Sequence, residues 1–276
     1  MQPDLSFLAG FIKNEAGIVL GEQKGYFVES RLSAVAAQHG HESVASLVAS
    51  LKAFPSAALR RDVVEALTTN ETSFFRDNTP FDNLKNKILP QLMAKRAGSK
   101  RLRFWCAAAS TGQEPYSLAM MLSEQGPKLA GWKIDILATD IDTAVLQKAQ
   151  AATYNKFEVQ RGLPVPLLLK YFDQCDGDRW QVKPAIRAMV TYKKLNLLDA
   201  QAGAGVFDVV FCRNVLIYFD LATKAMVLAK IAQQLSADGC LILGGAETVM
   251  GITDRFAAAP DIRGCYLPTV RIRNAA

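Results

Sequence analysis

The chain has 276 residues, of which 50% are hydrophobic, and a formal net charge of +6. This length accommodates one large domain or two ordinary ones. No apolar run approaches the roughly 18 residues that a membrane span requires, and no basic run interleaved with aromatic residues indicates a nucleic-acid partner. We therefore expect neither membrane insertion nor nucleic-acid binding.

The cysteines and histidines predict a cytoplasmic protein without a metal. The five cysteines are scattered and form no CxxC pair, which favours reduced thiols. Only His39 and His41 could supply imidazole ligands, so a zinc site is not expected. The N-terminus lacks the pattern of a signal peptide, and we interpret it as mature sequence.

Residues 1–75 predict a helical domain. Apolar residues recur at helical spacing in segments that begin near Phe7, Val28 and Val44. Residues 76–98 then predict a linker that contains a helix, because this stretch is polar at first and becomes periodic later.

From residue 99 onward, strands and helices alternate. This order predicts an α/β domain over residues 99–276 with a mostly parallel, Rossmann-like sheet. Residues 157–187 interrupt the rhythm with three prolines and an Asp176–Gly177 turn, which indicates a small inserted β-subdomain. The expected strands are Leu102–Cys106, Ile134–Thr139, Met189–Leu195, Phe207–Cys212 and Cys240–Gly244, with a final hairpin of Tyr266–Leu267 and Val270–Ile272. The expected helices are Glu114–Glu124, Thr143–Ala151 and Leu221–Leu235.

The stretch Arg103–Leu118, RFWCAAASTGQEPYSL, is the most informative part of the chain. A buried strand ends in small residues and leads into a helix, as in folds that bind an adenosine-type cofactor. Neither GxGxxG nor GxxxxGK[ST] occurs, so a phosphate-rich cofactor is not favoured. A nearby carboxylate suits a cofactor with a cationic end, and S-adenosylmethionine is the candidate. The alternative is a tight turn with a structural role.

Two acidic residues have both a functional and a structural interpretation. Asp140 ends the second strand, where it could accept hydrogen bonds from a ribose, while Asp142 fits as the N-cap of the next helix. Glu114 could face the cofactor, or it could form a capping box with Thr111.

Further polar residues follow the later strands. Arg213 and Asn214 end an apolar strand and need partners. Tyr218 could reach the crevice at the carboxyl end of this strand, or its ring could simply pack against other side chains. Asn196 could contact the adenine or cap a turn. Upstream, the interdomain segment supplies three more polar candidates, namely Asn70, Thr72 and Arg76.

Taken together, the segments NETSFFRD, AAASTGQEPYSLA, ATDIDTAVLQKA, LNLL and FCRNVLIYF resemble the CheR-type chemotaxis receptor methyltransferases over nearly the whole chain. The resemblance implies transfer of a methyl group from S-adenosylmethionine to glutamate side chains on the cytoplasmic helical bundle of a chemoreceptor. It also implies a monomeric protein, with S-adenosylhomocysteine as the cofactor product.

The resemblance also implies which residues form the site. Arg76 and Tyr218 would lie near the transferred methyl. The implied cofactor contacts are Asn70, Thr72, Arg76, Glu114, Asp140, Asn196, Leu197, Arg213 and Asn214. The family often has a glutamate where this chain has Gln113. Some members carry several arginines on the helix that faces the receptor, whereas the helix after Tyr26 has only Arg31, the candidate receptor contact.

Two alternatives remain open. One is a methyltransferase that acts on nucleic acid or a small molecule. The Asn/Asp-Pro-Pro-aromatic tetrapeptide of amino-methylating DNA enzymes is missing, since Val215 follows Asn214. The other is a signalling module that keeps the cofactor pocket without catalysis.

Overall fold

The computed structural model describes residues 4–21, 25–199 and 205–269. The chain divides into two compact units. The first comprises Met1–Thr69 and Tyr218–Thr223, and the second comprises Asn70–Ile217 and Lys224–Ala276. The chain therefore leaves the second unit after Ile217 and re-enters it at Lys224.

The first unit is helical. Its helices are α1 (Leu5–Ala16), α2 (Gly25–Gln38), α3 (Val44–Ala53) and α4 (Ala57–Ala66). Asp4, Ser43 and Ser56 cap α1, α3 and α4 by accepting backbone N–H bonds. The returning segment joins this unit through the N–H of Val19, which donates to the carbonyl of Tyr218 at 2.9 Å.

The second unit begins with a helical region and continues into a seven-stranded sheet. The helical region consists of α5 (Thr79–Asn83), the π-helical turn η1 (Leu84–Ile88) and α6 (Leu89–Lys95). The sheet strands are β1 (Arg101–Ala107), β2 (Lys133–Asp140), β6 (Val190–Lys194), β7 (Phe207–Cys212), β8 (Leu235–Leu243), β9 (Phe256–Ala258) and β10 (Cys265–Pro268).

The strand order is β6-β2-β1-β7-β8-β10-β9. The first five strands are parallel, and β10 pairs antiparallel with both β8 and β9. From β1 the chain runs outward through β2 to β6, and then returns to β7 on the other side of β1. This reversal makes the gap between the carboxyl ends of β1 and β7 the topological switch point, where open α/β sheets bind ligands.

The α/β fold class predicted from the sequence is confirmed. The helices α7 (Gln113–Ser123), α8 (Thr143–Ala151) and α12 (Leu221–Gln234) agree with the expected ranges within one residue at each end. β8 starts at Leu235, five residues before the expected strand at Cys240. Of the expected final hairpin, Val270–Ile272 lies outside the described residues, while Tyr266 pairs with both β8 and β9 and Leu267 pairs with β9.

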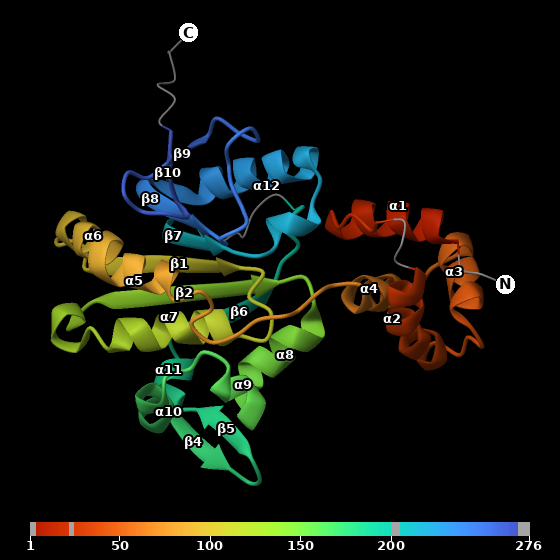
Figure 1. Ribbon diagram of the computed structural model, residues 1–276, viewed down its shortest axis with the longest axis horizontal. Helices are drawn as coiled ribbons and strands as arrows, with labels where there is room; N and C mark the ends of the chain where they lie inside the picture. Colours follow the sequence, from red (N-terminus) through yellow and green to blue (C-terminus); the bar gives the residue numbers. More distant parts are fainter. Residues whose placement is uncertain (1–3, 22–24, 200–204, 270–276) are drawn as a thin grey trace. The chain divides into compact units, whose positions relative to one another are not determined.

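A second sheet of three strands has the order β3-β5-β4, formed by β3 (Thr153–Asn155), β4 (Phe172–Cys175) and β5 (Arg179–Val182). Its hairpin turns at Asp176–Gly177, where Gly177 has a φ of 71° that an L side chain rarely adopts. Figure 1 shows this hairpin next to α9 (Lys156–Gln160) and α10 (Val165–Tyr171). The short helices η2 (Gly126–Leu129), α11 (Pro184–Arg187) and η3 (Leu216–Tyr218) complete the described elements.

The core of the second unit lies against the large sheet. Phe104, Phe211 and Ile242 are buried and belong to one cluster with the helical region before β1. Phe81 of α5 stacks on Phe211 with ring centroids 5.9 Å apart. The alternating residues Trp105, Val210 and Leu241 are buried as well, so the sheet is covered on both faces, as expected for parallel strands.

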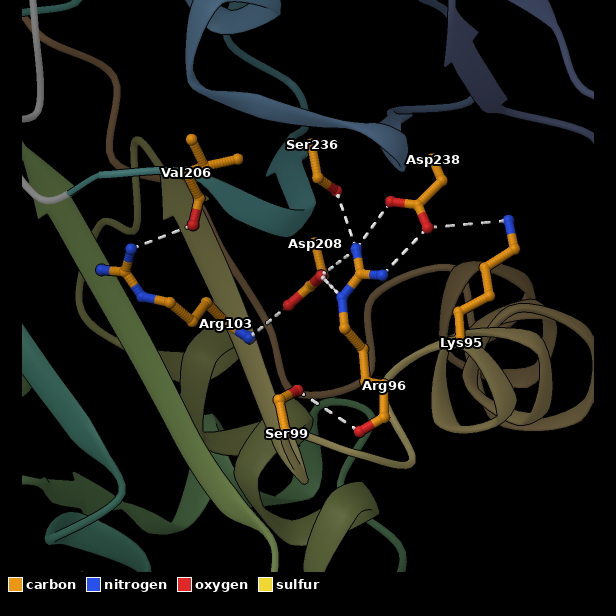
Figure 2. A network of polar contacts seen from close by, with 8 residues as sticks. All are labelled: Lys95, Arg96, Ser99, Arg103, Val206, Asp208, Ser236 and Asp238. Atoms are coloured by element: carbon orange, nitrogen blue, oxygen red, sulfur yellow. Dashed lines mark hydrogen bonds and ion pairs between the residues drawn. The ribbon is translucent and has the colours of Figure 1, made fainter.

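A polar network lies where β7 begins (Figure 2). Arg96 donates to Asp208 at 2.9 Å, to Asp238 at 2.6 and 2.9 Å, and to Ser236 at 3.4 Å. The other carboxylate oxygen of Asp208 accepts the backbone N–H of Arg103 at 2.8 Å. We call Arg96, Asp208, Asp238 and Ser236 the Arg96 network. It joins the end of α6 to β1, β7 and β8.

Candidate functional site

The loop after β1 has an unusual backbone. Ala108 and Ser110 have φ values of 61° and 50°, which are uncommon for residues other than glycine. A side chain at Gly112 would place its Cβ 2.8 Å from the hydroxyl of Tyr192 and 2.9 Å from the Cβ of Ala149. The loop is therefore held in a strained form directly at the switch point, as functional loops often are.

The capping box considered for Thr111 and Glu114 is wrong. The N-cap of α7 is Gly112, which has no side chain, and the hydroxyl of Thr111 donates instead to the side chain of Gln113 at 2.7 Å. Glu114 is therefore not used to cap its own helix.

Asp140 lies at the carboxyl end of β2 with 6% of its surface exposed. Its two oxygens accept the backbone N–H groups of Ser110 at 2.8 Å and of Asp142 at 3.0 Å. Burial raises its pKa to about 6, against these hydrogen bonds, which favour the charged form. Each oxygen retains acceptor capacity, because a carboxylate offers about four lone-pair positions.

Asp142 is the N-cap of α8, as expected. One oxygen accepts the N–H groups of Ala144 and Val145, at 2.8 and 3.2 Å. The other accepts from the side-chain amide of Asn70 at 2.7 Å, and the carbonyl of Asn70 accepts from the hydroxyl of Ser110 at 2.8 Å. Asn70 is thus tied to the two loops that surround Asp140.

Arg213 forms the centre of a second group. Its Nη1 donates to Glu114 Oε2 at 3.0 Å, and its Nη2 donates to Asp77 Oδ2 and to the carbonyl of Arg76, both at 2.7 Å. The side chain of Arg213 is 1% exposed. We call Arg213, Glu114 and Asp77 the Arg213 network. It joins the segment before α5 to the start of α7 and the end of β7.

The Arg213 network is only partly satisfied. Burial raises the pKa of Glu114, although the adjacent Arg213 guanidinium acts in the opposite direction. Within the described residues, the Nε of Arg213 is buried and has no hydrogen-bond partner. Buried polar atoms without partners are rare in native proteins, so this network retains capacity for a bound group.

Three further candidates of the second unit lie in loops. Asn196 follows β6, and its side-chain oxygen accepts the N–H of Leu198 at 3.0 Å, which makes a local turn. The preceding residue, Leu195, donates its N–H to the carbonyl of Asp140 at 2.9 Å, so this turn lies beside Asp140. Leu197 and Thr72 are half-buried.

Asn214 directly follows Arg213 and has a φ of 57°. Its N–H donates to Glu247 Oε2 at 2.7 Å. Glu247 is a buried carboxylate at this loop that the sequence analysis did not single out. The available signal was an acidic residue shortly after the buried strand β8, in the sequence GGAET.

Tyr218 and Arg31 belong to the first unit. Tyr218 is half-buried at the end of η3, and Arg31 is an exposed residue of α2 whose guanidinium lies 5.2 Å from the ring centroid of Phe27. Their roles near the methyl group and the receptor remain predictions.

The residues of the second unit fit S-adenosylmethionine. Asp140 retains acceptor capacity for ribose hydroxyls, and Glu114, paired with the buried guanidinium of Arg213, is a carboxylate that suits a cationic group. The thiols of Cys106 and Cys212 are buried and their pKa values are raised well above the usual range, so they are not activated nucleophiles. Among the described residues, no group of three or more His, Cys, Asp or Glu side chains could hold a metal.

Comparison with known proteins shows which family the chain is similar to. A family model described as "CheR methyltransferase, SAM binding domain" matches residues 70–264. A second one, "CheR methyltransferase, all-alpha domain", matches residues 3–68. No helix in the described ranges is both long and apolar enough to cross a membrane.

Three curated relatives show the extent of the similarity. The chemotaxis protein methyltransferase Cher2 of Pseudomonas putida is 43% identical over 89% of this chain and 90% of its own length. Chemotaxis protein methyltransferase 1 of Pseudomonas aeruginosa is 43% identical over 92% and 93%. The chemotaxis protein methyltransferase of Borreliella burgdorferi is 38% identical over 90% and 89%. The resemblance found in the sequence motifs is confirmed: the chain belongs to the CheR methyltransferase family, with its all-α domain and its S-adenosylmethionine-binding domain.

Proposed function

We propose that this protein transfers the methyl group of S-adenosylmethionine to glutamate side chains on the cytoplasmic helices of a chemoreceptor, forming methyl esters for sensory adaptation. The relatives are named chemotaxis protein methyltransferases, and the acidic site of the second unit lies where an α/β sheet binds its ligand. The observation that carries the proposal is the placement of Asp140, Glu114 and Arg213 around this switch point.

A glutamate acceptor suits the chemistry of these residues. A carboxylate with a reference pKa of about 4.3 is already ionised at neutral pH, so no general base is required. Both histidines, His39 and His41, belong to the first unit, and burial raises the pKa of the Cys106 and Cys212 thiols, so these two are not activated. S-adenosylmethionine, when bound, supplies an electrophilic methyl on a sulfonium, which leaves as a neutral thioether.

The residues around the switch point then act by binding and alignment. Asp140 would accept hydrogen bonds from the ribose, and Glu114 would accept from the ammonium of the methionine portion. Asn70, Thr72, Asn196, Leu197 and Asn214 would complete the cofactor site.

Arg76 and Tyr218 are proposed to act near the methyl. The guanidinium of Arg76 would attract a carboxylate of the cofactor or of the substrate. Tyr218 would orient the attacking oxygen. We expect Arg76→Ala to weaken cofactor binding and to lower kcat, because it removes a charged partner.

We propose separate roles for the predicted domains. The helical domain, residues 1–75, would contact the receptor through Arg31, while residues 99–276 would bind the cofactor after the linker of residues 76–98. The inserted subdomain, residues 157–187, would lie outside the catalytic core. We propose that the protein works as a monomer in the cytoplasm.

The experiment is transfer of tritiated methyl from S-adenosylmethionine to a chemoreceptor cytoplasmic fragment, followed by alkaline hydrolysis. We expect label on the receptor that is released by alkali as methanol, because esters hydrolyse and N-methyl groups do not. A receptor in which the acceptor glutamates are changed to alanine is the matched control and should stay unlabelled. Alkali-stable label, or label only in nucleic acid or a small molecule, would refute the proposed acceptor.

A further inference from the structure

The carboxylate of Glu247 accepts four backbone hydrogen bonds. Its Oε1 accepts from the N–H groups of Val215 at 3.0 Å and Leu216 at 2.8 Å. Its Oε2 accepts from Asn214 at 2.7 Å and Gly244 at 2.8 Å. A carboxylate has about four acceptor positions, so all of them are used.

These four donors come from the segments that follow two different strands. Asn214, Val215 and Leu216 follow Arg213 at the end of β7, whereas Gly244 directly follows β8. Glu247 is 9% exposed, so it connects the two strand ends from a buried position. Hydrogen bonds to a charged acceptor are shorter and stronger than neutral ones, and a buried carboxylate that receives four of them is firmly held.

The backbone geometry shows what this connection achieves. Asn214 adopts a left-handed backbone with a φ of 57°, which directs three successive N–H groups toward one carboxylate. The approach of the two strand ends also requires a glycine. A Cβ on Gly244 would lie 2.7 Å from Glu247 Oε2 and 2.9 Å from the side-chain nitrogen of Asn214.

We propose that Glu247 is a positioning residue of the cofactor site, which fixes the backbone after β7 so that Arg213 and Asn214 are presented in their binding orientation. This inference rests on the proposed function, because it assigns a task to residues of that site. Glu247 acts through the loop and does not itself contact the cofactor, since its acceptor positions are already occupied by the backbone.

The matched test compares Glu247→Gln with Asp208→Asn in the full-length protein. Glutamine has nearly the same shape, but its amide nitrogen cannot accept the two N–H groups that one carboxylate oxygen accepts. Asp208 is a second buried carboxylate on β7, 7% exposed, and it belongs to the Arg96 network at the other end of the strand. Both variants lose one buried charge, so they separate a site effect from a stability effect.

We would measure the S-adenosylhomocysteine Kd by calorimetry and the amide hydrogen exchange of residues 214–216, both well below the melting temperature. Glu247→Gln should raise the Kd about tenfold or more, equivalent to about 1.4 kcal/mol, and should accelerate exchange at these amides. Asp208→Asn should lower the melting temperature and leave the Kd and the exchange of these amides as in the wild type.

The inference is overturned if Glu247→Gln binds S-adenosylhomocysteine as tightly as the wild type, or if Asp208→Asn weakens binding equally. If Glu247→Gln does not fold, amide hydrogen exchange of the wild-type protein tests the inference instead. Its amides at 214–216 should exchange slowly without ligand, and rapid exchange that stops only with S-adenosylhomocysteine contradicts a preformed loop. Because neither readout needs a methyl acceptor, an incorrect acceptor assignment would leave these results unchanged.

Discussion

Two arginine–carboxylate networks lie at the two ends of β7, and they differ in how completely they are satisfied. In the Arg96 network, all three guanidinium nitrogens donate to Asp208, Asp238 or Ser236. In the Arg213 network, two nitrogens donate, and the buried Nε has no partner in the described part of the chain.

The pKa shifts of the carboxylates also distinguish the two networks. The Arg96 guanidinium lowers the pKa of Asp238 to about 2, because hydrogen bonding to the arginine outweighs burial. In the other network, burial raises the pKa of Glu114 despite Arg213. The Arg96 network is therefore a satisfied structural connection. The Arg213 network contains a largely buried carboxylate, Glu114, with a raised pKa, and perturbed pKa values are common in functional sites.

The largest expected effect comes from removing each arginine. Arg213→Met should lower the free energy of unfolding by about 3–5 kcal/mol, because it leaves Glu114 buried without its cation. Arg96→Met should cost less, about 1–3 kcal/mol, because the Arg96 side chain is 23% exposed and its partner Asp238, 34% exposed, can be hydrated. Urea denaturation at pH 7 measures both, and a larger loss for Arg96→Met would reverse the comparison.

The second prediction concerns Asp140. Asp140→Ala should weaken binding of S-adenosylmethionine and S-adenosylhomocysteine by about 1–3 kcal/mol each, because both share the ribose. Isothermal titration of the two ligands checks this, with Asp208→Asn as the control that should bind normally. Unchanged binding of both ligands with a lower melting temperature would make Asp140 a purely structural residue.

The third prediction is a pH dependence of cofactor affinity. Burial raises the pKa of Asp140 to about 6, and only the ionised form has all its oxygen lone pairs available to a ribose hydroxyl. The affinity should therefore be highest above pH 6 and fall as the pH decreases through this value, by at most about tenfold per unit for one proton. Titrations of S-adenosylhomocysteine between pH 5 and 8 measure it, and Asp140→Asn should show no such decrease. A decrease that persists in Asp140→Asn would assign the titration to another group.

The smallest expected effect belongs to Tyr218. Tyr218→Phe should lower kcat about 2- to 10-fold, the scale of one neutral hydrogen bond, and leave the cofactor Kd unchanged. Single-turnover methylation at saturating cofactor and receptor measures the step. A wild-type transfer rate would show that the ring of Tyr218 only packs.

Much of the fold was predictable because its elements are strongly patterned. β7 has the mostly apolar sequence FDVVFC, interrupted only by Asp208, and was predicted at its observed bounds, Phe207–Cys212. The pairing of Tyr266 with Leu241 of β8 was not predicted, because it joins residues that are distant in the sequence. The three-stranded sheet also includes Thr153–Asn155, whose three residues are too short to carry a period.

The site was partly predictable for a related reason. Acidic and basic residues at the ends of apolar strands, such as Asp140 and Arg213, stand out against their surroundings. What the sequence could not show was pairing between distant segments. Glu114 and Arg213 are 99 residues apart, and Glu247 reaches the loop at Asn214 across 33 residues. The strained loop of Ala108 and Ser110 was also hidden, because neither residue type predicts a positive φ.

The most direct test of the difference between the two networks is calorimetric titration of S-adenosylhomocysteine into the matched variants Arg213→Lys and Arg96→Lys. Each keeps the charge and loses the planar fork of donors. We predict that Arg96→Lys binds like the wild type, while Arg213→Lys binds about tenfold more weakly or worse. Equal affinities for the two variants, or a larger loss in Arg96→Lys, would contradict the assignment of the Arg213 network to the cofactor site.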